Sequence, residues 1–218
     1  MLATVSTAAP QALRRVPGPR MIGRDAEARA LEQGLRAGHV VAVTGDAGMG
    51  KTRLLQDFAQ PRTGVLHVQA RPGDAGVPFA TLARLWRAMA ASQVPPDAAR
   101  EPPGLALTDL AWPPASEAPV PAIPAAAQRL LMQRDLALRL QGQPAVSGVL
   151  LDDLHFADSA SLDLLQALLH EPAGPLQWAL AWRGVDAGRA LTDLQDSLAE
   201  QARLRAVPLQ PRDEAALT

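Results

Sequence analysis

A glycine-rich stretch, VTGDAGMGKTR at residues 43–53, holds residue types that suit the binding of phosphate. Glycines permit positive φ angles, so the backbone N–H groups of such a loop can close around an anion. Lys51 is the only lysine in a chain with 21 Lys and Arg residues, and its compact, movable ammonium could reach β- and γ-phosphate oxygens. Thr52 offers a hydroxyl to Mg²⁺. The pattern predicts a phosphate-binding loop; the alternative is a chance glycine turn at the start of a helix.

Every residue of this loop, glycine or not, is predicted to lie against the phosphates of a nucleotide. They are Gly45, Asp46, Ala47, Gly48, Met49, Gly50, Lys51, Thr52 and Arg53. Lys51 is also predicted to be catalytic, because its ammonium would contact the γ-phosphate oxygens.

Two aspartates follow a short apolar run in SGVLLDD, at residues 147–153. Asp152 is expected to hold Mg²⁺, in part through water, because Mg²⁺ keeps much of its hydration when bound to protein. Asp153 is expected to face the γ-phosphate and to orient or deprotonate an attacking water. The alternative is that the pair forms a solvated strand end or a helix cap.

Three further polar residues lie near these positions in the sequence. Arg183 ends the apolar run LQWALAWR and is expected either to contact the γ-phosphate or to be an ordinary surface arginine. His155 is expected to be an exposed polar residue, although it could help to position water. Asp158 is expected to cap the helix that follows it.

Apolar runs and helical periodicity alternate along the chain and predict the elements that would carry these residues. Strands are expected at 39–45, 64–70, 147–153, 176–183 and 204–209, and helices at about 25–38, 51–60, 79–91, 125–141, 159–171 and 187–202. Such alternation favours a parallel, doubly wound α/β sheet, in which ligands bind beyond the carboxyl ends of the strands. Trp178 and Trp182 are expected to pack in the core rather than against adenine.

Composition excludes several other kinds of site. The formal net charge is −1 and the basic residues are scattered, so this segment is not expected to bind nucleic acid or a membrane surface. The chain has no cysteine, which excludes disulfides, thiolate nucleophiles and cysteine zinc sites. No apolar stretch approaches the length of a membrane span. A cytoplasmic location is expected.

Four segments, taken in order, resemble those of the AAA-type STAND ATPases. The segments are MIGRDAEARALEQGL (21–35), GDAGMGKTRLL (45–55), VLLDDLHFADSASLDLL (149–165) and WALAWRG (178–184). These ATPases are signal-transduction modules of large bacterial regulators and are similar to origin-recognition-like AAA domains. Phe156 stands where the family more often has tryptophan.

The resemblance implies a three-layer P-loop NTPase sandwich with a parallel five-stranded sheet of the ASCE/AAA type. It implies ATP and Mg²⁺ as cofactors and a slow ATPase that acts as a nucleotide switch in signalling or transcription regulation. The backbone near Ile22 would flank adenine, with Gly23 and Arg24 beside it. Arg183 would be the first sensor of the γ-phosphate. The expected partners are ATP or ADP and other domains or subunits of a regulator.

Domain boundaries follow from the same patterns. Residues 1–20 are expected to be a disordered tail and 21–209 the ATPase domain, with nine prolines marking a loop or partly disordered insert at 94–124. Residues 210–218 resemble the start of a helical and winged-helix extension, so the helical lid is expected to be missing or truncated and hydrolysis by the isolated chain weak. Two other functions remain open: a P-loop small-molecule kinase, and a remnant that acts only as a binding module.

Overall fold

The computed structural model describes residues 21, 23–92, 125–141, 145–170 and 176–211. The expected tail at 1–20, the expected insert at 94–124, Ile22 and most of the expected extension at 210–218 therefore lie outside the described residues.

A five-stranded sheet forms the centre of the fold, as predicted. Its strands are β1 (Val40–Thr44), β2 (Val65–Gln69), β3 (Gly148–Asp152), β4 (Gln177–Trp182) and β5 (Leu204–Pro208). All neighbouring strands pair in parallel, in the order β2-β3-β4-β1-β5. This order places β4 between β1 and β3, so the carboxyl ends of those three strands lie side by side.

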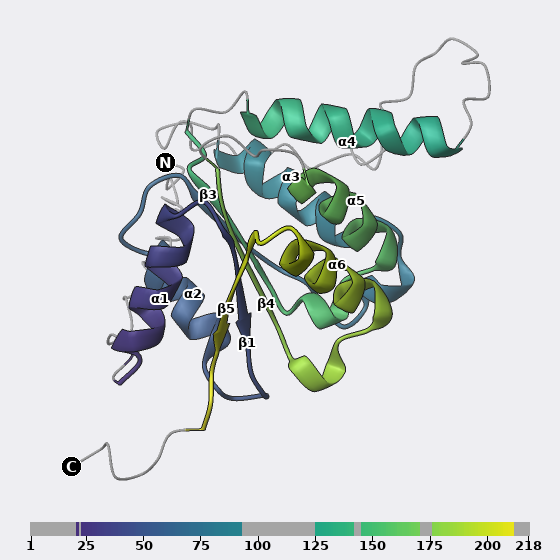
Figure 1. Cartoon of the computed structure of the whole chain (residues 1–218). Coiled ribbons are helices and arrows are strands. Elements are labelled where there is room, and N and C mark those ends of the chain that lie inside the picture. Colours follow the sequence, from purple (N-terminus) through teal and green to yellow (C-terminus); the bar gives the residue numbers. More distant parts are fainter. Residues whose placement is uncertain (1–20, 22, 93–124, 142–144, 171–175, 212–218) are drawn as a thin grey trace, which may run out of the picture.

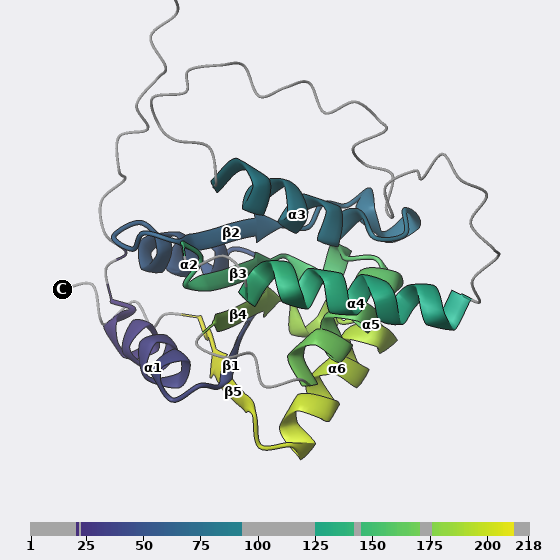
Figure 2. The same ribbon diagram turned by 90° about the horizontal axis from the view of Figure 1, so that it is seen from above.

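Helices cover both faces of the sheet and complete the expected three-layer sandwich (Figure 1). They are α1 (Asp25–Arg36), α2 (Lys51–Ala59), α3 (Ala80–Ser92), α4 (Ala125–Gln141), α5 (Ser159–His170) and α6 (Arg189–Glu200). One face packs against α1 and α2, and the other against α3, α5 and α6. The view from above shows α4 outside α5, on which it packs (Figure 2).

Alternating side chains of the strands supply the two cores. In β1, Val41 and Val43 pack with α1 and α2, because successive residues of a strand point to opposite faces. In β4, Trp178 and Trp182 pack with the larger helical layer and are 3% and 2% exposed, which confirms the prediction that they are core residues. The buried residues that β4 contributes to the α1 and α2 side are Ala179 and Ala181.

Asp158 joins two helices at their N-termini, directly after the acidic end of β3. Its Oδ1 accepts hydrogen bonds from the backbone N–H groups of Ser161, at 2.8 Å, and Phe79, at 2.7 Å. Its Oδ2 accepts one from Thr81 at 3.2 Å. The prediction that Asp158 caps the helix after it is confirmed for α5, and the same carboxylate also caps α3. It fixes the β2–α3 connection, in which Phe79 has a positive φ of 63°.

Asp158→Ala should lower the free energy of unfolding by about 3 kcal/mol, because it leaves three N–H groups of helix starts without an acceptor in a buried place. Asp163→Ala is the matched control, since Asp163 lies on the exposed face of α5. Urea denaturation followed by circular dichroism measures both. Equal midpoints for the two variants would contradict the double cap.

Candidate functional site

The loop predicted to bind phosphate connects β1 to α2, and its shape depends on three glycines. The angle φ is +148° at Gly45, +79° at Gly48 and +89° at Gly50. Residues with a Cβ rarely adopt these angles, so the sequence pattern and the conformation agree. Gly50 precedes Lys51, the first residue of α2, so the loop folds back over the start of the helix.

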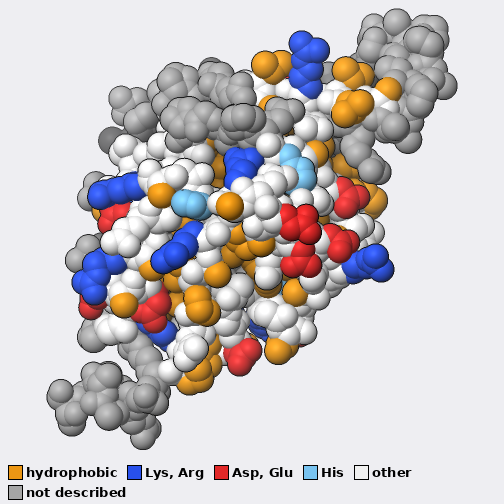
Figure 3. Space-filling model, viewed as in Figure 1, with side chains coloured by type: hydrophobic (Ala, Val, Ile, Leu, Met, Phe, Trp, Pro, Cys, Tyr) orange, Lys and Arg blue, Asp and Glu red, His pale blue; other side chains and the backbone are white. Residues whose placement is uncertain are grey.

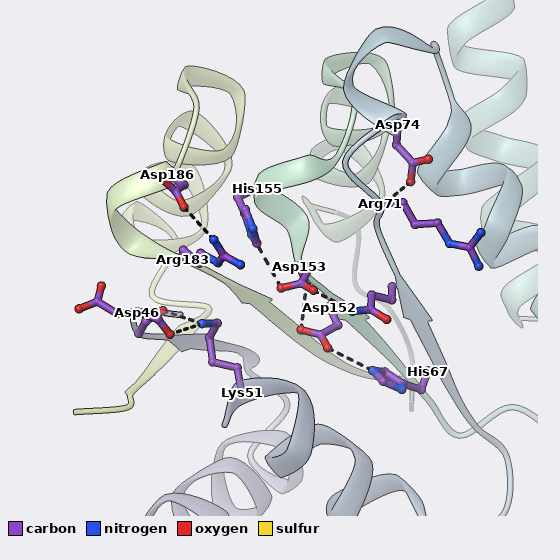
Figure 4. Close-up of polar contacts among 12 residues, drawn as sticks. Asp46, Lys51, His67, Arg71, Asp74, Asp152, Asp153, His155, Arg183 and Asp186 are labelled. Carbon is purple, nitrogen blue, oxygen red and sulfur yellow. Dashed lines mark hydrogen bonds and ion pairs between the residues drawn. The ribbon is translucent and has the colours of Figure 1, made fainter. Parts of the chain in front are cut away.

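Lys51 is buried inside this loop. Its Nζ donates hydrogen bonds to the backbone oxygens of Gly45, at 2.7 Å, and Asp46, at 2.8 Å (Figure 4). Burial lowers the pKa of Lys51, the charge of Asp153 opposes that shift, and the charge of Arg183 adds to it. The loop therefore holds a cation at the point where the ends of β3 and β4 meet β1.

Asp152 ends β3 and is completely buried, so it is not a solvated strand end. Burial pushes its pKa upward, but the nearby His67 ring, the Thr52 hydroxyl and the N–H of Asp153 outweigh that effect, and the pKa lies below its ordinary value. The Asp153 N–H donates to Oδ1 at 2.8 Å. Asp152 is therefore a carboxylate at neutral pH.

The other oxygen of Asp152 provides a test of whether this site fits a magnesium ion. Oδ2 is buried and has no hydrogen-bond partner in the described part of the chain. His67 Nε2 lies 3.6 Å away, which is longer than a hydrogen bond. A free carboxylate oxygen beside the Thr52 hydroxyl fits Mg²⁺, which takes one or two protein ligands and completes its shell with phosphate and water. No cluster of three or more His, Cys, Asp or Glu side chains could hold a metal elsewhere in the described ranges.

Asp153 follows the strand with a positive φ of 54°. Aspartate tolerates this left-handed conformation better than most residues do, yet it carries a strain that is typical of functional turns. Gln69 Nε2 donates a hydrogen bond to Asp153 Oδ2 at 2.8 Å. Asp153 thus lies between the end of β2 and the loop that holds Lys51.

Arg183 follows β4 directly, at the same edge of the sheet. Its guanidinium lies 3.6 Å from Asp186 and 5.9 Å from the centre of the Phe156 ring. Its charge acts on both Lys51 and His155. The structure therefore brings together Lys51 and Arg183 with both aspartates, as the sequence predicted for a site beyond the strand ends.

His155 differs from its prediction. It was expected to be exposed, but its side chain is only 2% exposed. It lies in a short 3-10 helix, η3 (Leu154–Phe156). Its ring packs beside the ring of Phe156, with 4.0 Å between the ring centres. Burial lowers the pKa of His155 below its ordinary value.

Two residues of β2 belong to the site and were not predicted. His67 reaches Asp152, and Gln69 reaches Asp153, because β2 pairs with β3 in register. The signal was present in the sequence: GVLHVQA places polar residues at alternate positions toward the carboxyl end of an otherwise apolar strand.

Other predicted cofactor contacts lie at the side of the loop. Arg24 is 6% exposed, and its Nη2 donates to the backbone oxygens of Gln210, at 2.7 Å, and Met49, at 3.5 Å. Gly23, before it, has a positive φ of 72°. Arg53 forms an ion pair with Asp57 at 2.9 Å. In this structure, Arg24 therefore binds the loop backbone and the segment after β5.

Gly45 fits against the same segment. Leu209 N donates to Thr44 O at 2.7 Å, and a Cβ added at Gly45 would lie 2.6 Å from Leu209 O. The phosphate loop is therefore held against residues 209 and 210 at two points, through Gly45 and through Arg24.

The model of the family described as AAA ATPase domain matches residues 20–179, which span the loop, the acidic strand end and the first half of β4. The chain belongs to the AAA ATPase domain family. The broad assignment drawn from the sequence is thereby confirmed. No curated protein sequence matches the chain significantly.

Several solved structures are similar to this AAA ATPase domain. A Walker-type ATPase of Pyrococcus abyssi matches with a TM-score of 0.54 and 15% identity, over 90% of this chain and 55% of that one. Domain III of the replication initiation protein DnaA of Thermotoga maritima matches with a TM-score of 0.44 and 18% identity, over 90% and 66%. Drosophila ORC bound to DNA and Cdc6 matches with a TM-score of 0.44 and 13% identity, over 89% and 61%. The chain thus spans little more than half the length of the archaeal ATPase.

The charged surface and the helices of this AAA ATPase domain bear on other kinds of partner. On the face shown in Figure 3, the described Lys and Arg side chains are scattered and form no continuous basic patch. None of the described helices combines the length and the hydropathy that crossing a membrane requires.

Gly45→Ala should lower the free energy of unfolding by about 1–3 kcal/mol more than Gly38→Ala does, because only the first forces a methyl group against a backbone oxygen. Gly38 is the control, with a φ of +78° and no atom within 4 Å of an added Cβ, so alanine there adopts a positive φ without a steric contact. The φ of +148° at Gly45 is less accessible still to alanine and adds to the difference. Urea midpoints of the two variants measure the difference. If the two variants were equally stable, the close packing of the loop on Leu209 would be disproved.

Proposed function

We propose that this AAA ATPase domain is a nucleotide switch that binds Mg-ATP and hydrolyses it slowly. The observation that carries the proposal is the buried ammonium of Lys51, held inside a glycine loop near the carboxylates at the end of β3. A buried cation bound only to neutral carbonyl oxygens would gain from the approach of a triphosphate, because hydrogen bonds to a charged acceptor are stronger.

Binding uses the loop and the beginning of α2. The backbone N–H groups between Asp46 and Thr52 and the positive end of the helix would bind the phosphates. Thr52 and Asp152 would hold Mg²⁺, which when bound neutralises charge on the β- and γ-phosphates. Residues 21–24 would flank the base, as the resemblance to STAND ATPases implies.

Hydrolysis requires a water in line with the γ-phosphate. Asp153 would hold and orient that water, since it is the carboxylate that Gln69 keeps beside the lysine loop. Arg183 would stabilise negative charge on the γ-phosphate, and its place after β4 suits it to report whether that phosphate is present.

The regulatory role rests on the resemblance to STAND modules. A switch needs contacts that differ between the ATP and ADP states, and a γ-phosphate contact made by Arg183 would provide one. Its partners would be other domains or subunits of a signalling or transcription regulator, in the cytoplasm where ATP is available, with no direct contact of this segment to nucleic acid.

Lys51→Ala should weaken Mg-ATP binding about 10- to 100-fold, because it removes charge-assisted hydrogen bonds worth about 1.5–3 kcal/mol. Arg36→Ala is the control, since it removes a positive charge from a side chain that is 74% exposed on α1. Isothermal titration on folded protein gives both dissociation constants. An unchanged affinity in the lysine variant would refute the site, and no binding by the wild-type chain would refute the function.

Asp153→Asn should bind Mg-ATP as the wild type does and should release phosphate about 100-fold more slowly, since a positioned base contributes at least that factor. Asp163→Asn makes the same chemical change on the exposed face of α5 and should leave the rate unchanged. Phosphate release at saturating Mg-ATP is the measurement. Wild-type turnover in the Asp153 variant would assign the water to another residue.

A further inference from the structure

His155 is a buried polar side chain whose hydrogen-bonding groups are unused. Its side chain is 2% exposed, and neither Nδ1 nor Nε2 has a hydrogen-bond partner in the described residues. A buried polar group left without a partner costs about 1–3 kcal/mol, so a leucine or phenylalanine would serve packing better at this position. The presence of a histidine at this position is therefore best explained by a function of its ring nitrogens.

The surroundings of the ring indicate which partner it serves. Its Nδ1 lies 4.0 Å from Asp153 Oδ1 (Figure 4). Phe156 packs against the ring and at the same time faces the guanidinium of Arg183. The apolar contact fixes the ring plane, while the nitrogen remains directed to the carboxylate.

The two oxygens of Asp153 face different partners. Its Oδ2 already accepts a hydrogen bond from Gln69 at 2.8 Å, whereas Oδ1 faces His155. The gap of 4.0 Å is about 1 Å longer than a hydrogen bond, which a small side-chain rotation closes. Catalytic hydrogen bonds are often long in the absence of substrate and shorten when it binds.

We propose that His155 is a positioning residue for the hydrolysis: its Nδ1–H donates to Asp153 Oδ1, and together with Gln69 it fixes the plane of the carboxylate that orients the water. The proposal rests on the proposed function. No proton is transferred in this contact. Burial keeps the ring neutral by lowering the pKa of His155, so the ring has one N–H group and one free nitrogen.

Two amide variants separate the two ring nitrogens. In His155→Asn the amide nitrogen takes the place of Nδ1, whereas in His155→Gln it takes the place of Nε2. Phosphate release should stay near the wild-type rate in the asparagine variant and fall about 10-fold in the glutamine variant, which loses a hydrogen bond to a charged group. The dissociation constant of Mg-ATP should be the same in both. Equal rates, or the reverse order, would overturn the proposal.

The tautomer of His155 gives a second readout, which needs neither nucleotide nor turnover. In the ¹⁵N-histidine NMR spectrum of the full chain, the signal that disappears in His155→Asn identifies the residue. The expected form is neutral with the proton on Nδ1, and Asp153→Ala should shift it toward the Nε2–H form that is favoured in free histidine. The proposal would be overturned by an Nε2–H ring in the wild type, or by the same tautomer in the wild type and in Asp153→Ala. Failure of the switch function would instead appear in the ATP titration of the wild type.

Discussion

One buried charge organises this structure. The ammonium of Lys51 lies out of water, and a cation in that position needs acceptors on every side from which water has been removed. Two of them are the loop oxygens of Gly45 and Asp46. They face the ammonium only because glycines give the loop its positive φ angles, and because α2 begins at the lysine itself. The loop, the helix start and the burial of the charge therefore depend on one another.

The strand order supplies the remaining charges. Because β4 lies between β1 and β3, Arg183 follows the strand that separates the lysine loop from the aspartates. Opposite charges thus meet at one edge of the sheet, and two of them act on the pKa of Lys51: Asp153 favours its charged form, and Arg183 disfavours it. A triphosphate with its magnesium ion has the charge pattern that such an edge accepts.

Much of this arrangement could be predicted from the sequence, and the parts that could not share a physical reason. The strands and the loop depend on local signals: β-branched runs, helical periodicity and glycines at fixed spacing before Lys51. The burial of His155 depends on a 3-10 helix of one turn. Such a helix is too short to produce a periodic pattern of apolar residues in the sequence. Gln69 and Arg24 act on residues 84 and 186 positions away, respectively, and such contacts follow from strand pairing and chain path rather than from neighbouring residues.

The family assignment and the geometry support each other, since the AAA ATPase match includes Lys51, Asp152 and Asp153, which the fold brings to one edge of the sheet. The proposed function requires that the backbone N–H groups of the glycine loop bind phosphate. Hydrogen–deuterium exchange of the amides of residues 46–52, with and without Mg-ATP, tests this most directly. We expect these amides to become protected by Mg-ATP while those of β5 do not change. Loop amides that exchange at the same rate with and without nucleotide would contradict it.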